Sequence, residues 1–211
     1  MIVKGSSSNI KPIPAGVQPA VCVWLIDVGT QTPNNPQYKP SRKVRLGWEL
    51  PYEEPIEIEG VKMPRTITAE YGASLGRKAK LRSVLEDWRG RAFTPEELAG
   101  FDLKKLIGVN CQINIIHVPG TKDPSKVYAK VQSVIPLGKG QAASKPSGST
   151  IVFNIPETGD IIIPADLPEW IVEEIKKSEE YVARYSGGAA PAAPAAPDAP
   201  PADDGSEECP F

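Results

Sequence analysis

Residues 42–50 read RKVRLGWEL, in which polar and apolar side chains alternate. Because successive side chains of an extended strand point to opposite faces, the apolar ones share one face and the charged ones share the other. The apolar face carries Val44, Leu46, Trp48 and Leu50. The pattern predicts a β-strand that buries this face in a core and leaves the charged side chains outside it.

Further runs with strand-like composition lie on both sides of this one. Together they predict five strands, at about residues 20–28, 42–50, 65–71, 109–117 and 126–135. Residues 74–88 have helical spacing instead, and the short segments TPEELAG and FDLKKLIG continue this helical region. Thr94, Pro95 and Glu97 predict a helix N-terminus, since Thr can accept from free amides and Pro at the first helical position needs no acceptor.

The order of these elements is three strands, a helical segment and two strands, which is the order of the OB-fold. We therefore expect a mainly β protein: an OB-fold-like five-stranded barrel with a helical insert between strands three and four, a C-terminal helix and a disordered tail. The barrel domain would span residues 1–165. An amphipathic helix is expected over 166–186, where Leu167, Trp170, Ile171 and Ile175 recur at near-helical spacing. A Pro/Ala linker (187–202) and an acidic tail (203–211) follow.

Charge is divided unevenly along the chain. The whole sequence has 24 Lys and Arg against 26 Asp and Glu. Residues 187–211 hold five of these acids and no base, and residues 166–186 are acidic as well, so residues 1–165 carry a net positive charge. A basic body joined to an acidic end indicates that the two regions have different partners.

Basic and aromatic side chains share the outward face of the predicted strands. The fifth, KVYAKVQSV, places Tyr128 on a polar face with Lys126 and Lys130. Cations neutralise phosphates while a ring stacks on a base, so the pattern favours binding of single-stranded nucleic acid; a solvated sheet face is the alternative. Two loops that border the groove of an OB-fold add further cations. The predicted DNA-binding residues are Tyr38, Lys39, Arg42, Lys43, Arg45, Lys122, Lys126, Tyr128 and Lys130.

The other aromatic residues divide by their neighbours. Trp48 shares a face with aliphatic side chains, and Tyr71 aligns with Ile67, so both are expected in the core. Trp24 lies on a strand that is apolar on both faces, where it could pack or stack.

The chain ends in DDGSEECPF, an acidic segment with a terminal aromatic residue. An aromatic ring that follows acidic residues at the end of an extended linker can enter a shallow basic pocket, where a cation pairs with the free carboxylate. A merely solubilising acidic end is the alternative. The predicted partner-docking residues are Asp203, Asp204, Glu207, Glu208, Pro210 and Phe211.

This layout resembles that of bacterial single-stranded-DNA-binding proteins, which join an OB-fold to a Gly/Pro-rich linker and an acidic tip ending in Pro-Phe. Cys209 stands where that family usually has an aliphatic residue. Over about residues 20–140, LGWELP, WRGRAFTPEELAGFDLKKLIGVNCQINI and KVQSVIPLGKG are more similar to small phage proteins encoded beside replication and recombination genes. The resemblance implies a phage-encoded protein that coats single-stranded DNA in the cytoplasm of the infected cell and recruits host or phage replication and repair proteins through its tail.

Other functions are weighed against this one. The motifs GxGxxG, GxxxxGK[ST], HExxH and GxSxG do not occur, so we expect no enzyme and no cofactor. Three widely spaced cysteines and the single His117 give no metal spacing and favour a reducing, intracellular setting. Neither a secretory signal nor an apolar run long enough to span a membrane occurs. Acids at Glu53, Glu54, Glu57 and Glu59 could bind a metal but are expected on an exposed connection. A protein-only recruitment adaptor and a strand-annealing recombination protein remain as alternatives.

Overall fold

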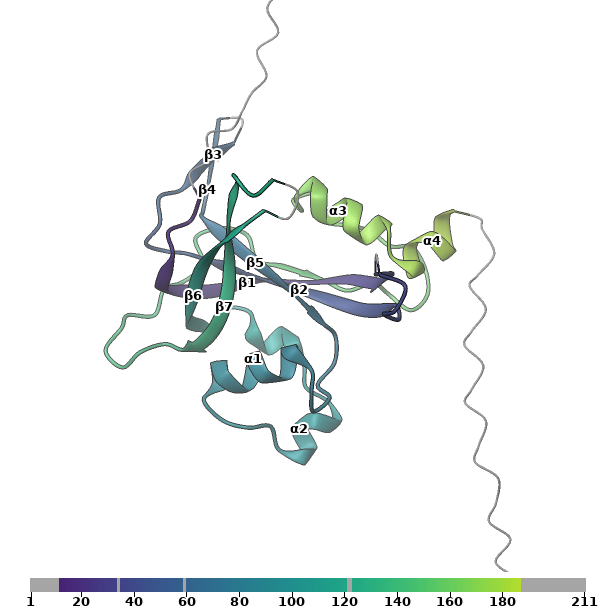
Figure 1. The fold of residues 1–211 in the computed structure, drawn as a ribbon, viewed down its shortest axis with the longest axis horizontal. Helices are drawn as coiled ribbons and strands as arrows, with labels where there is room; N and C mark the ends of the chain where they lie inside the picture. Colours follow the sequence, from purple (N-terminus) through teal and green to yellow (C-terminus); the bar gives the residue numbers. More distant parts are fainter. Residues whose placement is uncertain (1–11, 34, 59, 121–122, 187–211) are drawn as a thin grey trace, which may run out of the picture.

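The fold is described by a computed structural model that covers residues 12–33, 35–58, 60–120 and 123–186 (Figure 1). Five longer strands form most of it: β1 (Gly16–Gln31), β2 (Ser41–Glu49), β5 (Thr66–Gly72), β6 (Asn110–Pro119) and β7 (Val127–Pro136). They are antiparallel in the order β5-β2-β1-β6-β7. β5 and β7, at the two ends of this order, also contact each other. The expected mainly β class and all five expected strands are confirmed.

Strand β1 is longer than the sequence predicts and bends along its length. Its register against β2 shifts between Cys22 and Trp24 and again between Asp27 and Gly29. Such bulges bend a strand and increase its twist, which lets β1 pair with β6 through its first half and with β2 through its second.

Three short strands are absent from the sequence prediction. β3 (Ile56–Ile58) and β4 (Val61–Met63) form a hairpin between β2 and β5, and β8 (Ile151–Phe153) pairs in parallel with β1. Each has only three residues, which is too few for a period-two pattern to stand out from a loop.

The helical region between β5 and β6 contains α1 (Lys80–Arg89), α2 (Pro95–Ala99) and the 3-10 turn η1 (Leu103–Leu106). The predicted cap is confirmed: Thr94 Oγ1 accepts from the Glu97 N–H at 3.3 Å, and the Glu97 carboxylate accepts from the Thr94 N–H at 3.1 Å. The helix expected from residue 74 begins only at Lys80, because the Ser74 side chain accepts from the Gly76 N–H and forms a turn instead.

The expected helix over 166–186 consists of two: α3 (Glu169–Lys176) and α4 (Glu179–Tyr185). Ser178 separates them, because its side chain accepts from the Tyr181 N–H and caps the second helix. Its hydroxyl also donates to the carbonyl of Ile175 at 2.7 Å. The single helix expected over 166–186 is therefore divided in two, because Ser178 caps a new helix.

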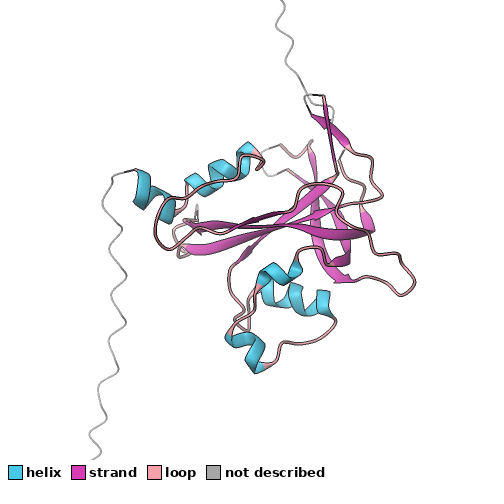
Figure 2. Ribbon diagram, turned by 180° about the vertical axis from the view of Figure 1, so that it is seen from behind, coloured by secondary structure: helices cyan, strands magenta, loops and turns pink. Residues whose placement is uncertain are grey.

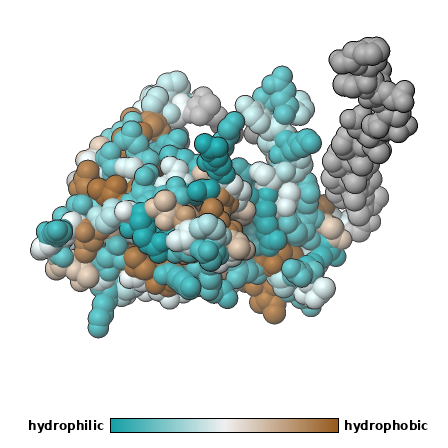
Figure 3. Space-filling view, turned by 90° about the horizontal axis from the view of Figure 1, so that it is seen from below, coloured by the Kyte–Doolittle hydropathy of each residue, from teal (hydrophilic) through white to brown (hydrophobic). Residues whose placement is uncertain are grey.

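Helices cover the two sides of the sheet (Figures 1 and 2). α1 and α2 lie on one side, and α3 and α4 lie on the other. Seen from the α1 and α2 side, the surface is mostly hydrophilic, with separate hydrophobic patches (Figure 3). We call the side that faces α1 the inner face of the sheet and the side that faces α3 the outer face.

Each face has its own apolar cluster. The inner core joins all five long strands to α1; Trp48 is fully buried there, with its ring centroid 6.0 Å from that of Trp88. The outer cluster consists of Ile26, Val28, Ile151, Phe153, Ile155, Ile161, Leu167, Ile171 and Ile175. It includes residues on both sides of position 165, where the sequence prediction placed a domain boundary.

Candidate nucleic-acid interface

Strand β7 presents the aromatic and basic side chains that the sequence predicts on its outward face. Tyr128 is 54% exposed, and Lys126 and Lys130 are exposed on either side of it, whereas Val131 is buried. Neither lysine forms an ion pair with any of the residues that the structure describes. The Tyr128 ring lies against the backbone of Gly120, where an added Cβ would stand 2.7 Å from the ring. The ring is therefore held in place yet open to a ligand.

The predicted cations of β2 are arranged differently, because acidic side chains neutralise them. Arg42 forms a 2.5 Å ion pair with the buried Asp27, and Lys43 lies 3.8 Å from Glu70. Arg45 pairs with both Glu70, at 2.9 Å, and Glu174, at 2.8 Å. The candidate DNA-binding set thus divides into open cations on β7 and paired cations on β2.

Arg45 also fixes helix α3 over the outer face of the sheet. Its guanidinium carbon lies 4.8 Å from the centroid of the Trp170 ring, and Glu174 on the same helix accepts hydrogen bonds from its Nε and Nη2. Burial, together with a hydrogen bond to Glu70, raises the pKa of Glu174 to about 7 against the opposing effect of Arg45. Two carboxyl groups that share one guanidinium compete for it, so one of them binds a proton more readily.

The remaining predicted residues lie elsewhere. Tyr38 is 68% exposed and, with the exposed Lys39, lines a hollow that also contacts Lys43, Glu70 and Glu174. Lys122 lies outside the described residues, as do the docking residues Asp203, Asp204, Glu207, Glu208, Pro210 and Phe211.

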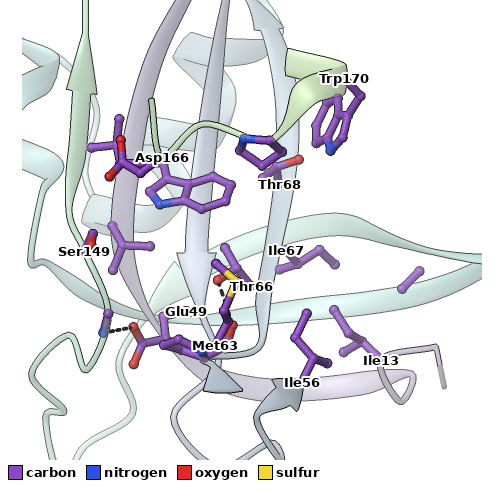
Figure 4. Close-up of a pocket in the computed structure, with 17 residues that line it drawn as sticks. Ile13, Glu49, Ile56, Met63, Thr66, Ile67, Thr68, Ser149, Asp166 and Trp170 are labelled. Carbon is purple, nitrogen blue, oxygen red and sulfur yellow. Dashed lines mark hydrogen bonds between the residues drawn. The ribbon is translucent and has the colours of Figure 1, made fainter. Parts of the chain in front are cut away.

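A deep cavity of about 580 Å³ opens on the outer face beside α3 (Figure 4). Trp24 and the β5 residues Thr66 and Thr68 line it from the sheet. The β3–β4 hairpin contributes Ile56 and Met63. Its other walls are residues 148–151 and the beginning of α3, including Trp170 at the upper rim in Figure 4.

A shallower hollow of about 390 Å³ continues the cavity toward β7. Both hollows are lined by Ile13, Ile56, Thr66 and Ala129, and the shallower one also reaches Tyr128. We call the two together the outer groove. It carries Trp24 and Trp170 at its deep end and Tyr128 at its shallow end.

Gly47 of β2 determines how Trp24 lies. A Cβ at Gly47 would stand 2.9 Å from Trp24 Cβ and 3.0–3.1 Å from two ring atoms. The indole therefore packs directly on the β2 backbone, which no larger residue at position 47 would allow. Trp24 is partly buried and packs against the outer cluster while it lines the cavity.

The sequence prediction missed Trp170, Ile56 and Met63 as groove residues. Trp170 was assigned to the apolar stripe of a helix, yet it is 51% exposed. The sequence carries one indication of this exposure. Trp170 directly precedes Ile171, and adjacent residues of a helix point in different directions, so its side chain points away from the face that Ile171 and Ile175 bury.

The deep end of the groove is uncharged except for two carboxylates. Glu49 is buried and accepts hydrogen bonds from the Ser147 and Gly148 backbone N–H groups and the Ser147 hydroxyl. Asp166 is the second of these carboxylates and also lines the cavity. No Lys or Arg lines this end among the described residues.

The remaining titratable side chains of interest that the structure describes do not line the outer groove. His117 is exposed, and its Nε2 lies 2.8 Å from the carbonyl of Ile13. Glu53 and Glu54 follow β2, Glu57 lies in β3, and Glu59 is outside the described residues. No group of three His, Cys, Asp or Glu side chains placed to hold a metal ion occurs in the described ranges. None of the helices described is long and apolar enough to cross a membrane.

Comparison of the sequence with protein-family models and with curated proteins found no match.

Proposed function

We propose that this chain binds single-stranded DNA through the outer groove, without reading base order, and that its acidic end recruits partner proteins in replication, recombination or repair. The strand order β5-β2-β1-β6-β7, with α1 between β5 and β6, supports an OB-fold-like five-stranded barrel in which β5 and β7 close the sheet. In such a barrel oligonucleotides bind the face of the second and third strands, here β2 and β5, and the loops between strands one and two and between strands four and five.

The observation that carries the proposal is the position of Tyr128. This exposed ring stands between two exposed lysines at the mouth of a groove whose far end has two more aromatic side chains. Phosphates can follow Lys126 and Lys130 while bases stack on the rings. The paired cations of β2 are expected to contribute less to phosphate binding, because a phosphate would compete with Asp27, Glu70 and Glu174 for them.

A salt-dependent titration with labelled single- and double-stranded oligonucleotides tests the proposal. We expect a clear preference for single strands, little dependence on base order, and an affinity that falls steeply with salt. Equal affinity for duplex, or no binding at low salt, would contradict it. The second result would leave a protein-only adaptor as the better description.

Variants locate the site. Tyr128→Ala should cost about 1–3 kcal/mol of binding free energy, the contribution of one base stack. Tyr52→Ala is the matched control, because Tyr52 is 69% exposed and lies outside the groove. Lys130→Ala should weaken binding and flatten the salt slope by about 0.7, the effect of one phosphate contact on a single strand. Lys43→Ala and Arg45→Ala should change the slope less, since both side chains are already paired.

The tail is tested separately. Phe211→Ala should abolish capture of a replication or repair protein from bacterial extract, because the ring is lost. Ser206→Ala is the control. Deletion of 203–211 should leave affinity for single strands unchanged or modestly tighter at low salt, since acids repel phosphate. If deletion weakens DNA binding and the captured proteins stay the same, the tail belongs to the DNA site.

A further inference from the structure

The deep end of the outer groove differs from its shallow end in both charge and shape. The shallow end is lined by Arg65 and by Tyr128, whose chain neighbours Lys126 and Lys130 are exposed. The deep end is a cavity of about 580 Å³ between the sheet, the β3–β4 hairpin and α3. Its aromatic side chains come from two separate parts of the chain: Trp24 from β1 and Trp170 from α3. We propose that this cavity is a pocket for one unpaired nucleobase, closed on its outer side by Trp170. The inference rests on the proposed function and deepens it.

Charge selects a base over a phosphate for this cavity. Glu49 and Asp166 both line it, whereas no Lys or Arg is among the described lining residues. The nearby Arg45, which lies against Trp170, is already paired with Glu70 and Glu174. A phosphate would therefore be repelled, while a neutral base would not. The phosphates of the same strand can remain on Lys126 and Lys130 at the shallow end, where the cations are open to solvent. The groove thus separates the two chemical parts of a nucleotide strand.

The lining suits the faces and the edges of a base. An indole offers a stacking surface to any base, and Ile56 and Met63 on the hairpin add apolar contact. Thr66, Thr68 and Ser149 line the cavity. The Thr66 hydroxyl donates to the Pro64 carbonyl at 3.3 Å and can still accept from the polar edge of a base, while the Thr68 hydroxyl accepts from Arg45 at 3.5 Å and can still donate. In Figure 4 Thr68 lies beside Trp170, while Thr66 lies close to Met63.

Trp170 is held in position before any ligand arrives. On one side Ile171 and Ile175 of the same helix are fully buried in the outer cluster. On the other side Arg45 lies over the Trp170 ring and pairs with Glu174 one turn further along α3. The ring remains 51% exposed, so a base that covers it gains burial with little loss of side-chain entropy.

The test uses the full chain and two probes: a single-stranded oligonucleotide of about 4–16 nucleotides, the site range of such barrels, and an abasic strand of the same length. Trp170→Ala should weaken binding of the ordinary strand by about 5- to 150-fold, the range of one lost stack. It should leave the affinity for the abasic strand unchanged, which loss of a charge or a loosened fold would not do. Trp170→Phe should restore part of the loss.

Two further measurements complete the test. Ile162→Ala is the control, because Ile162 is 82% exposed in the same C-terminal segment and does not line the cavity. Tryptophan fluorescence should be quenched by the ordinary strand in the intact chain and less so in Trp170→Phe. If the chain binds single strands and loses affinity in Tyr128→Ala, yet Trp170→Ala binds them as tightly as the intact chain, the base pocket is wrong and the proposed function stands. If the intact chain binds no strand at low salt, both are wrong.

Discussion

The inner and outer faces of the sheet are covered in different ways. On the inner face, apolar side chains of every long strand pack against α1 in one cluster. On the outer face, the apolar cluster is smaller, and residues 147–186 are attached to the strands largely through acidic side chains. The inner face therefore depends on burial, while the outer face depends on a few specific hydrogen bonds as well.

Besides the Glu174–Arg45 pair, three carboxylates make these attachments by accepting from backbone N–H groups. Asp27 accepts from the Ile155 N–H at 3.2 Å, and Glu49 accepts from the N–H groups of Ser147 and Gly148. Glu180 of α4 accepts from the Thr30 N–H at 2.7 Å and from its hydroxyl at 2.8 Å. Buried carboxylates are costly unless they are hydrogen-bonded, so each attachment is sensitive to geometry. We expect the outer segment to open before the sheet unfolds.

The largest expected effect is on the inner face. Trp48→Ala should lower the free energy of unfolding by about 3–5 kcal/mol, because it removes a fully buried ring from the centre of the core. Chemical denaturation measures the loss. Trp48→Phe is the matched variant and should cost much less, since the Trp48 Nε1 has no hydrogen-bond partner among the described residues. A Trp48→Ala protein as stable as the parent would show that the inner cluster is not the main core.

Gly29→Ala should release the outer segment while the sheet stays folded. Gly29 has φ of +73°, and a Cβ there would stand 2.5 Å from Ser178 Cβ and 2.8 Å from Glu180 Oε2. Hydrogen exchange should accelerate in α3 and α4 and remain slow in β2 and β6. Gly159→Ala is the control, because Gly159 has φ of +85° but no atom within 4 Å of its Cβ position. Equal acceleration in both variants would assign the effect to backbone strain rather than to contact with α4.

A smaller effect should follow pH through Glu174. Its pKa is about 7 in the folded chain against a usual value of 4.5, so the folded state holds the proton more tightly. The stabilisation is therefore complete below about pH 4.5 and is lost as the pH rises to about 7. Arg45 and Glu70 face this carboxyl group, and Lys43 pairs with Glu70.

Exchange of the α3 amides, corrected for the intrinsic pH dependence, checks this expectation. Protection should decrease between pH 5 and pH 8 in the parent and change less in Glu174→Gln, which cannot ionise. Protection that instead increases over this range would mean that the charged form, paired with Arg45, is the one that holds α3 in place.

The inner face could be predicted from the sequence and the outer face could not, for a physical reason. Alternation in RKVRLGWEL places Trp48 and its neighbours correctly, because a strand's period is local information. The partners of Arg45 cannot be read from the sequence near it. Glu70 faces Arg45 only through the β2–β5 register, and Glu174 is 129 residues away in the chain. The sequence shows which cations exist, whereas the fold determines which acids reach them.

Trp170 and the hairpin illustrate the same limit. The period of a helix predicts that Leu167, Ile171 and Ile175 share a buried face, and they do. It does not predict that the exposed ring beside them stands over a cavity whose opposite wall, Ile56 and Met63, belongs to strands of three residues. The deep end of the groove is thus assembled from segments whose individual patterns carry little signal.

The smallest expected effect on stability is at the residue that carries the proposed function. Tyr128→Ala should change the free energy of unfolding by no more than about 0.5 kcal/mol, as surface substitutions usually do, because its ring is 54% exposed and is a member of neither apolar cluster. Tyr71→Ala is the matched comparison. Tyr71 is 7% exposed in the inner core, where burial also raises its pKa to about 12, and its removal should cost about 3–5 kcal/mol.

The two tyrosine variants distinguish a residue that stabilises the fold from a residue that binds a ligand. Tyr128→Ala should lose affinity for single strands and unfold at the same denaturant concentration as the parent. Tyr71→Ala should unfold at a lower denaturant concentration, while its folded fraction keeps its affinity for single strands. Denaturation and oligonucleotide titration of both variants under one set of conditions give the answer. If Tyr128→Ala destabilises the chain as much as Tyr71→Ala does, the outward ring supports the fold, and its weaker binding would say nothing about a contact with a base.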